Sequence, residues 1–220
     1  MSAGPGAITR VYCPYYNSDK KSIEWGQTSS HQVELLSNLQ NHFTVTNGFV
    51  MQQGTEETIE DETSERNSAI ENVRVGVHVG IDVSFGELSP RGLRVLKNPH
   101  KISQVLCGAM SLRNIGNRQQ KDSAIKEQIL LEAAYKGAFL AAIKHGSSRL
   151  FLTMLGTEKQ DNEIGDIFNA IWYAYRDFGH GKINTSLKEV HLIIRSPVPE
   201  LDQFYKYMCQ AHVPIEIHKY

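Results

Sequence analysis

The chain has 220 residues, of which 40% are hydrophobic and 21% are charged, and its formal net charge is -1. This length suits one domain, or one domain with an appendage, and the near-neutral charge gives no electrostatic argument for nucleic acid or an anionic membrane as the main partner. No apolar stretch approaches the roughly 20 residues needed to cross a bilayer, and the first residues lack the pattern of a signal peptide. Three cysteines cannot all pair within one chain, so we expect reduced thiols and a cytoplasmic, or alternatively nuclear, protein: Cys13, Cys107 and Cys209.

The first 72 residues predict an irregular N-terminal part. Residues 8–16 are aromatic-rich and fit either a strand or a short helix, and residues 31–39 carry a weak helical stripe. Residues 43–51 alternate in hydrophobicity like a strand, with Asn47 and Gly48 as a turn inside it. Residues 55–71 are rich in glutamate, which favours a solvated surface segment; an acidic docking surface is the alternative.

Residues 73–83 form the clearest predicted strand. Valine or isoleucine stands at every second position, and small or polar residues stand between them, which predicts one apolar face turned toward the core. His78 and Asp82 share the other face but lie about 13 Å apart at ~3.3 Å per residue, too far for a hydrogen-bonded dyad. Asp82 lies near the carboxyl end of this predicted strand, where ligand sites of α/β proteins gather.

The rest of the sequence alternates between strand and helix patterns. A loop with several glycines and prolines is predicted at residues 84–100, followed by an apolar strand at residues 102–110. Further strands are predicted at residues 149–156, 189–195 and 214–218, and helices at residues 122–144, 163–178 and 200–211. This order predicts an α/β fold with a mostly parallel sheet between helices. We expect a single domain over residues 1–220, with its α/β core at residues 73–220.

The strand that ends at Gly156, and the loop after it, are the first place to expect a site, because ligands bind beyond the carboxyl ends of strands in open α/β folds. Free N–H groups at the start of the next helix favour an anion such as phosphate. Asp161 or Asn162 could instead cap that helix and take the anion's position, so a plain capped loop is the alternative. One lysine faces four carboxylates in this stretch, which opposes phosphate: Lys159 against Glu158, Asp161, Glu163 and Asp166.

No strong catalytic signature is present, since the sequence has no GxSxG, P-loop, HExxH or GxGxxG motif. Cys209, His212 and His218 are spaced somewhat like zinc ligands, but no fourth ligand is near in sequence, and ordinary surface or core roles are preferred. Cys107 follows an apolar strand, which favours a buried, inert thiol over a nucleophile. We therefore expect no metal and no cofactor.

A set of short segments between about residue 30 and residue 196 has the pattern of a known family. These segments are Asn47–Phe49, Val75–His78 with Asp82, Ile102–Met110, Leu131–Tyr135 and Phe151–Asn162. Together they resemble the macrodomain-like, ADP-ribose-recognising proteins, in the branch related to poly(ADP-ribose) glycohydrolase. Within that branch the sequence is similar to the bacterial effector that removes ADP-ribose from ubiquitin.

This resemblance implies a three-layer α/β/α macrodomain-like fold, with ADP-ribose across the carboxyl ends of the strands. Asp82 would be the acid–base or ribose-orienting carboxylate in hydrolysis of an ADP-ribosyl linkage; the alternative is a strand residue that bonds a neighbouring backbone N–H. ADP-ribose, or a protein that carries it, would be the partner. The ligand-binding residues would lie in two segments, one along the diphosphate or distal ribose and one on the opposite wall: Gly156, Thr157, Asp161 and Asn162, and Gly108, Ala109, Met110 and Ser111.

Two departures from the family pattern favour a rival hypothesis. Relatives carry a glycine-rich loop where this chain has residues 157–161 between Gly156 and Asn162, and acidic side chains oppose the close approach of a phosphate. Residues 4–7 look like the middle of the family domain, so we expect the upstream strands that contact adenine and the proximal ribose to be missing. The rival is a non-enzymatic interaction module that keeps the fold and has lost the pocket. An unrelated α/β hydrolase or transferase is a third hypothesis, without a nucleophile motif to support it.

Overall fold

The computed structural model describes the core elements of the chain and parts of its N-terminal third. The described residues are 7–8, 14–17, 20–25, 33–46, 48–51, 59, 63–89, 92–110, 121–157, 163–179, 185–194 and 200–211. Within these ranges, no helix combines the length and the apolar character that a membrane crossing requires.

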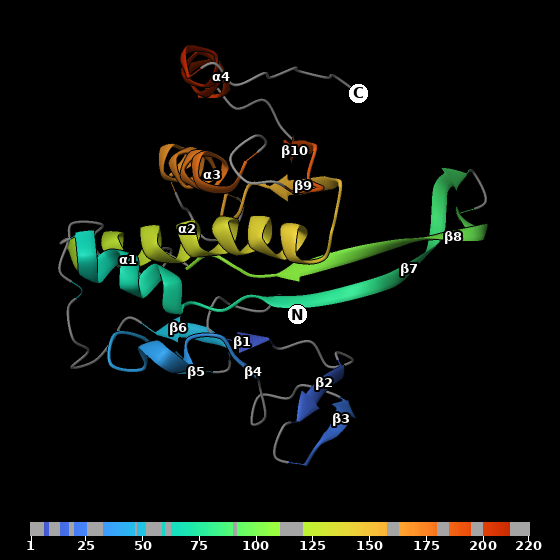
Figure 1. Cartoon of the computed structure of the whole chain (residues 1–220), viewed down its shortest axis with the longest axis horizontal. Helices are drawn as coiled ribbons and strands as arrows, with labels where there is room; N and C mark the ends of the chain where they lie inside the picture. Colours follow the sequence, from blue (N-terminus) through green and yellow to red (C-terminus); the bar gives the residue numbers. More distant parts are fainter. Residues whose placement is uncertain are drawn as a thin grey trace.

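Strands dominate the first half of the chain and helices the second (Figure 1). The helix α2 lies between α1 and α3, and the ribbon of β7 and β8 projects away from the helices. The elements in chain order are β1 (Ala7–Ile8), β2 (Pro14–Asn17), β3 (Ser22–Trp25), β4 (Val33–Glu34), a 3-10 turn (Ser37–Leu39), β5 (Thr44–Thr46), β6 (Phe49–Met51), α1 (Thr63–Asn72), β7 (Gly76–Ser89), β8 (Gly92–Leu106), α2 (Lys121–Lys144), β9 (Arg149–Thr153), α3 (Ile164–Phe178), β10 (Glu189–Ile193) and α4 (Leu201–Gln210).

The long helix α2 is the centre of the molecule, as its apolar sequence predicts. It is rich in alanine and leucine, which are strong helix formers, and most of its side chains are buried. Gly137 lets α2 approach the chain just before β7, because a Cβ at this position would lie 2.6 Å from Cγ1 of Val75. The helix ends at Gly146, whose φ of +66° suits glycine and reverses the chain toward β9.

The two parallel strands β9 and β10 rest on this helix by one face only. They pair in register, with Arg149 opposite Glu189 and Thr153 opposite Ile193. Leu150 and Leu152 of β9 are buried, whereas Phe151 between them is 60% exposed. The prediction of a fully buried strand is therefore wrong: its side chains alternate between core and solvent because no described element covers the outer face.

The helices α3 and α4 complete the apolar core on the other side of α2. The predicted helix at residues 163–178 is confirmed, since α3 places Ile167, Ile171 and Ala174 in the same buried cluster as β9. Its N-cap is Glu163, without a side-chain cap, and the two residues that could cap it, Asp161 and Asn162, lie outside the described residues. The amphipathic helix α4 packs on α3 through two aromatic pairs. The rings of Phe168 and Phe204 are stacked with their centroids 4.3 Å apart, and those of Trp172 and Tyr207 meet edge to face with their centroids 5.3 Å apart.

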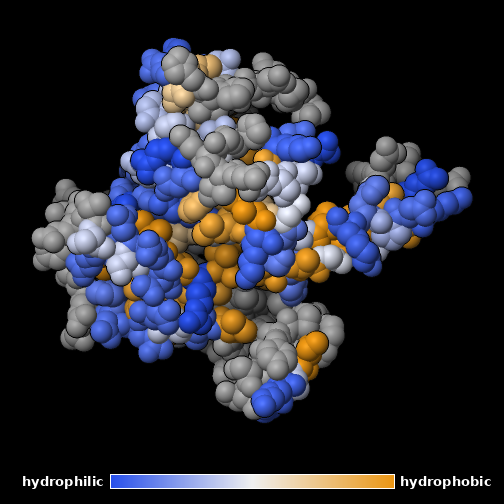
Figure 2. Space-filling view, viewed as in Figure 1, coloured by the Kyte–Doolittle hydropathy of each residue, from blue (hydrophilic) through white to orange (hydrophobic). Residues whose placement is uncertain are grey.

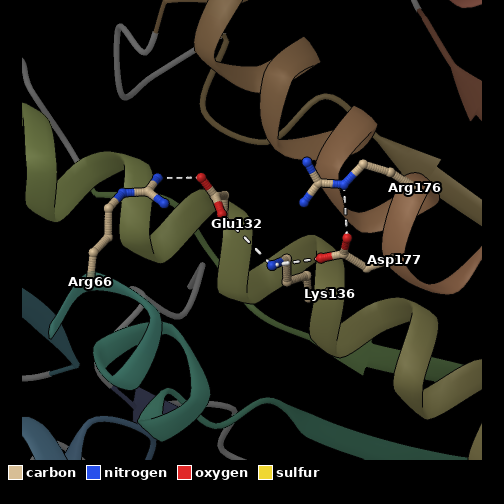
Figure 3. A network of polar contacts seen from close by, with 5 residues as sticks. All are labelled: Arg66, Glu132, Lys136, Arg176 and Asp177. Atoms are coloured by element: carbon tan, nitrogen blue, oxygen red, sulfur yellow. Dashed lines mark hydrogen bonds and ion pairs between the residues drawn. The ribbon is translucent and has the colours of Figure 1, made fainter. Parts of the chain in front are cut away.

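A ladder of charged side chains joins the three central helices (Figure 3). Arg66 of α1 bonds Glu132 of α2, and Lys136 of α2 lies 3.9 Å from the other oxygen of Glu132. Lys136 also lies 2.9 Å from Asp177 of α3, which Arg176 contacts at 2.9 Å on its other oxygen. The Glu132 side chain is only 5% exposed, and its burial is stabilised because cations stand on both sides of it.

The antiparallel hairpin of β7 and β8 replaces the predicted loop at residues 84–100. Glycines and prolines predicted a loop there, but β7 continues to Ser89 and β8 begins at Gly92. The partner of Val83 is His100 and that of Phe85 is Val95, so the intervening stretch of β8, with Pro99, bulges out of the ladder. A two-stranded ribbon accepts proline at such an irregularity because the residue needs no partner for its missing N–H.

The predicted alternation of residues 73–83 fails at Gly80. Its φ is +70°, and the pairing of the two strands shifts between His78 and Ile81. The extra residue is typical of a glycine bulge, which turns Val79 outward until it is 57% exposed. The strand itself is confirmed from Gly76 onward, whereas its continuous apolar core face is wrong.

The N-terminal strands form separate short pairs. The predicted hairpin at residues 43–51 is confirmed, with β5 and β6 joined through Gly48 at a φ of +82°. The helical stripe predicted at residues 31–39 is wrong, since β4 and a 3-10 turn occupy this stretch. Residues 8–16 contribute to two strands, as one of the two interpretations allowed. The acidic segment includes α1, and Ile59 within it is fully buried.

These elements confirm a mixed α/β chain. Among the described residues the strands pair only in twos: β9 pairs with β10 in parallel, and the other four pairs are antiparallel. The three-layer arrangement, the mostly parallel sheet and the single domain over residues 1–220 stay predictions. The predicted strand at residues 214–218 lies outside the described residues.

Candidate functional site

A cleft of about 990 Å³ opens between β8 and β9, with α2 as its floor. Its walls are consecutive residues of both strands, from Lys101 to Cys107 and from Ser147 to Thr153. Its floor consists mainly of small residues, among them Ala138 and Ala142. Apolar side chains gather in the middle of this face of the molecule, at the base of the β7–β8 hairpin (Figure 2).

The cleft lies between strand edges that no described strand covers. Among the described strands, β8 pairs only with β7 and β9 only with β10, so one edge of each faces the cleft. Their carboxyl ends meet at the same point of α2, since Cys107 and Thr153 both line the cleft beside Tyr135. The unit β8–α2–β9 is therefore a parallel crossover with an open position between its strands. The carboxyl end of such an opening is where α/β folds bind ligands.

Tyr135 closes the floor of the cleft at this end. Its ring is almost completely buried, at 2% exposure, in the cluster that α2 shares with β9 and α3. Its hydroxyl donates a hydrogen bond of 2.9 Å to the carbonyl of Thr153 and accepts one of 2.9 Å from the N–H of Leu155. Burial raises the pKa of Tyr135, the hydrogen bond from Leu155 opposes this rise, and the nearby Cys107 thiol adds to it. The phenol therefore stays protonated and can donate its hydrogen bond.

The loop after β9 begins directly beyond this hydroxyl. Gly156 has a φ of +86°, a conformation that favours glycine, and the Thr157 hydroxyl donates a hydrogen bond of 3.3 Å to the carbonyl of Met154. Both predicted ligand residues of this segment, Gly156 and Thr157, are half-buried. Asp161 and Asn162, also predicted to bind ligand, lie outside the described residues.

The chain that leaves β8 continues directly from Cys107, the last residue of this wall of the cleft. Gly108 is half-buried, while the side chains of Ala109 and Met110 are buried in the two main apolar clusters. These two residues can therefore offer a ligand only backbone groups. Ser111, the last predicted ligand residue of this wall, lies outside the described residues.

Cys107 lies at the carboxyl end of the cleft but has the properties of an inert thiol. Burial raises the pKa of Cys107 to about 11, so the thiol is protonated at neutral pH. Thiolates, not thiols, are the nucleophiles of cysteine chemistry. The buried environment agrees with the interpretation of Cys107 as a core residue.

Asp82 is not brought to this end of the cleft. It lies on the projecting hairpin opposite Lys101, whose Nζ is 3.2 Å away, and its side chain is 56% exposed. The stretch of β8 from Lys101 to Cys107 spans about 20 Å at ~3.3 Å per residue. Asp82 is therefore separated from Gly108 and Gly156, because β7 runs antiparallel to β8 and its Gly76, not Asp82, pairs near the carboxyl end of β8.

The positively charged side chains that line the cleft lie away from the carboxyl ends of β8 and β9, among the described residues. The cations among its described lining residues are Lys101 and Arg149, both at the opposite mouth and both paired with carboxylates, Asp82 at 3.2 Å and Glu189 at 3.0 Å. An anion at the carboxyl end would rely on the backbone N–H groups of Gly156 and Thr157, because the N–H of Leu155 already donates to Tyr135. Among the described residues, no group of three or more His, Cys, Asp or Glu side chains is placed to hold a metal ion.

Sequence reasoning missed Tyr135 as a site residue. Its position in the apolar stripe of α2 is that of an ordinary core aromatic, and the sequence gives no sign that its hydroxyl bridges two backbone groups of a strand end. The only available signal is chemical: a buried tyrosine needs a partner for its hydroxyl.

Comparison with known proteins gives a partial likeness to one enzyme. No known family model matches the chain, and no curated protein sequence is significantly similar to it. Among solved structures, it is similar to the poly(ADP-ribose) glycohydrolase of Thermomonospora curvata, with 19% identity and a TM-score of 0.43 over 62% of this chain and 46% of that one. The structure of the same enzyme bound to the inhibitor ADP-HPD has 18% identity to this chain and a TM-score of 0.44, over 62% of this chain and 48% of that one. The chain thus spans about half the length of these enzymes, and a likeness of this extent assigns it neither a family nor an activity.

Proposed function

We propose that this protein binds ADP-ribose, free or attached to a protein, at the carboxyl ends of β8 and β9. The observation that carries the proposal is the fixed backbone at the end of an open cleft: Tyr135 holds the end of β9, and Gly156 turns the chain beside it. A cleft of about 990 Å³ falls at the upper end of the usual range for small-ligand sites.

Two segments of the ADP-ribose family pattern that are distant in sequence meet at this cleft. Residues 102–107 of the first segment line one wall, and residues 151–153 and Leu155 of the second line the other. Residues 131–135, a third such segment, end at the Tyr135 that lies between them. A resemblance confined to core packing would not require the three segments to converge at one opening, so their convergence supports a shared ligand site.

The chemistry of the turn suits a diphosphate held by neutral donors. Backbone N–H groups bind phosphate where the chain turns tightly, and glycine allows the close approach that a side chain would block. Gly108 follows Cys107 and Gly156 follows Leu155, both of which line the cleft, so each glycine lies next to the site that the resemblance implies. Because no described lining residue at this end is cationic, affinity would depend on backbone geometry more than on charge.

We extend the proposal to hydrolysis of the ADP-ribosyl linkage, with a substrate such as modified ubiquitin. The exposed position of Asp82 favours binding without hydrolysis, because a general acid or base has to reach the reacting atoms.

The rival, an interaction module without the pocket, is favoured by a different surface. The outer face of β9 and β10 exposes Phe151, stacked on His191 at 4.7 Å, and Ile193.

Calorimetric titration with ADP-ribose tests the binding proposal through two glycines. Gly156→Ala strains a backbone with a φ of +86° and should weaken ADP-ribose binding by about tenfold or more, because the cost of order 1 kcal/mol falls on the turn that holds the ligand. Gly146→Ala is the matched control, since Gly146 also has a positive φ, +66°, but lies at the far end of α2. The Gly146→Ala variant should lose as much free energy of unfolding as Gly156→Ala but keep its affinity for ADP-ribose. Equal losses of affinity in both variants, or no heat with the unmodified chain at millimolar ADP-ribose, would contradict the proposal.

A further inference from the structure

The hydroxyl of Tyr135 bonds two backbone groups that normally belong to a sheet. The carbonyl of Thr153 and the N–H of Leu155 point to the same side of the chain, as the groups on either side of one strand residue do. In a parallel sheet a single residue of the next strand accepts from one of these groups and donates to the other. One hydroxyl, which can donate once and accept at the same time, performs both functions here.

The hydroxyl thus stands where the peptide group of a neighbouring strand would stand. Thr153, Leu155 and Tyr135 all line the cleft, so the bonds are made at the opening between β8 and β9. Without them, a carbonyl and an N–H at the end of β9 would be left unpaired in a part-buried place, which costs free energy. The ring cannot follow a moving loop, because it is enclosed by the main apolar cluster, with Phe139 one helical turn away.

We infer that Tyr135 is a positioning residue for the ligand turn: its hydroxyl replaces a missing strand neighbour, fixes the path of residues 153–157, and so presents the N–H groups of Gly156 and Thr157 to the ligand. The importance for ADP-ribose rests on the proposed function, whereas the fixing of the turn does not. The hydrogen bond from Thr157 to Met154 lies on the far side of Leu155, so the turn is held at both of its ends. The opening is therefore a built feature of the fold, with its strand edge satisfied where the ligand turn begins.

Tyr135→Phe removes the hydroxyl and keeps the ring, and hydrogen exchange of the Leu155 amide reports on the turn directly. We expect this amide to exchange about tenfold faster in the variant, since a hydrogen bond of this kind contributes on the order of 1 kcal/mol. Tyr175→Phe is the matched control: Tyr175 lies on α3 with its ring in edge contact with Phe139, and within the described residues its hydroxyl makes no hydrogen bond. Exchange at Leu155 should be unchanged there.

Titration of the same two variants with ADP-ribose tests the link to the ligand. Tyr135→Phe should bind about tenfold more weakly than Tyr175→Phe. An unchanged exchange rate at Leu155 in Tyr135→Phe would overturn the inference, whatever the ligand does. Faster exchange with unchanged affinity would overturn the role in ligand positioning. If the unmodified chain binds no ADP-ribose but exchange at Leu155 accelerates, the proposed function fails while the fixing of the turn stands.

Discussion

At the scale of single residues, position on the fold decides which polar groups can act. Asp82 and Tyr135 illustrate this in opposite directions. The sequence marks Asp82 as chemical and Tyr135 as core, but the structure exposes Asp82 on a ribbon and places the Tyr135 hydroxyl at the end of the cleft. The antiparallel direction of β7 explains the first case, and a pair of backbone hydrogen bonds explains the second.

Asp82→Ala should leave ADP-ribose affinity within about twofold of the unmodified chain. The carboxylate is exposed and pairs with an exposed lysine, and such pairs contribute on the order of 0–1 kcal/mol. Calorimetry measures this directly. A loss of affinity greater than tenfold would show that the hairpin folds back over the ligand. Loss of ADP-ribose release from a modified protein, with affinity unchanged, would confirm the catalytic prediction for Asp82.

At the scale of elements, the charge ladder across α1, α2 and α3 holds the floor of the cleft in place. It contacts α2 at Glu132 and Lys136, on either side of Tyr135 in sequence. Burial raises the pKa of Asp177, but the hydrogen bonds and charges of Lys136 and Arg176 outweigh this effect, so the pKa lies below its usual value. A lowered pKa in the folded state stabilises the fold above the unfolded pKa, and this stability is lost as the pH falls through the folded pKa.

Asp177→Asn should therefore destabilise the chain at neutral pH and much less at low pH. We expect the free energy of unfolding to fall by about 1 kcal/mol at pH 7, because a part-buried, doubly bonded carboxylate is lost. At a pH low enough to protonate the carboxylate of the unmodified chain, below its lowered folded pKa, the difference should shrink toward zero. Urea titrations at both pH values measure it, with Glu189→Gln as an exposed-carboxylate control of small effect. A difference that does not change with pH would contradict the ladder's role.

The elements that sequence predicts well are those whose own side chains decide their packing. The helices α2, α3 and α4 follow their apolar patterns, and β9 and β10 appear where β-branched and leucine residues cluster. The hairpin was mispredicted because Gly86 and Pro99 signal a loop, yet a two-stranded ribbon with a bulge tolerates both. The alternation through Gly80 failed because one bulged residue turns the following side chains to the other face.

At the scale of the whole molecule, the site is an opening that no local pattern could predict. It exists because α2 carries the chain from β8 to β9 past an open strand position, and because the walls come from segments more than forty residues apart. Gly108 and Gly156 follow the carboxyl ends of β8 and β9, but no sequence pattern measures the gap between those strands. The depth of the cleft follows from small residues on α2, whose spacing also suits ordinary helix packing.

Amide chemical-shift mapping during titration with ADP-ribose tests the central claim most directly. The ligand should perturb two groups of amides that are distant in sequence, residues 107–110 after β8 and residues 154–157 after β9, and it should leave the tip of the β7–β8 hairpin unchanged. The outer face of β10, around His191 and Ile193, should also be unaffected, since neither of these residues lines the cleft. Shifts confined to that outer face, or no shifts at millimolar ADP-ribose, would contradict the claim that this cleft is an ADP-ribose site.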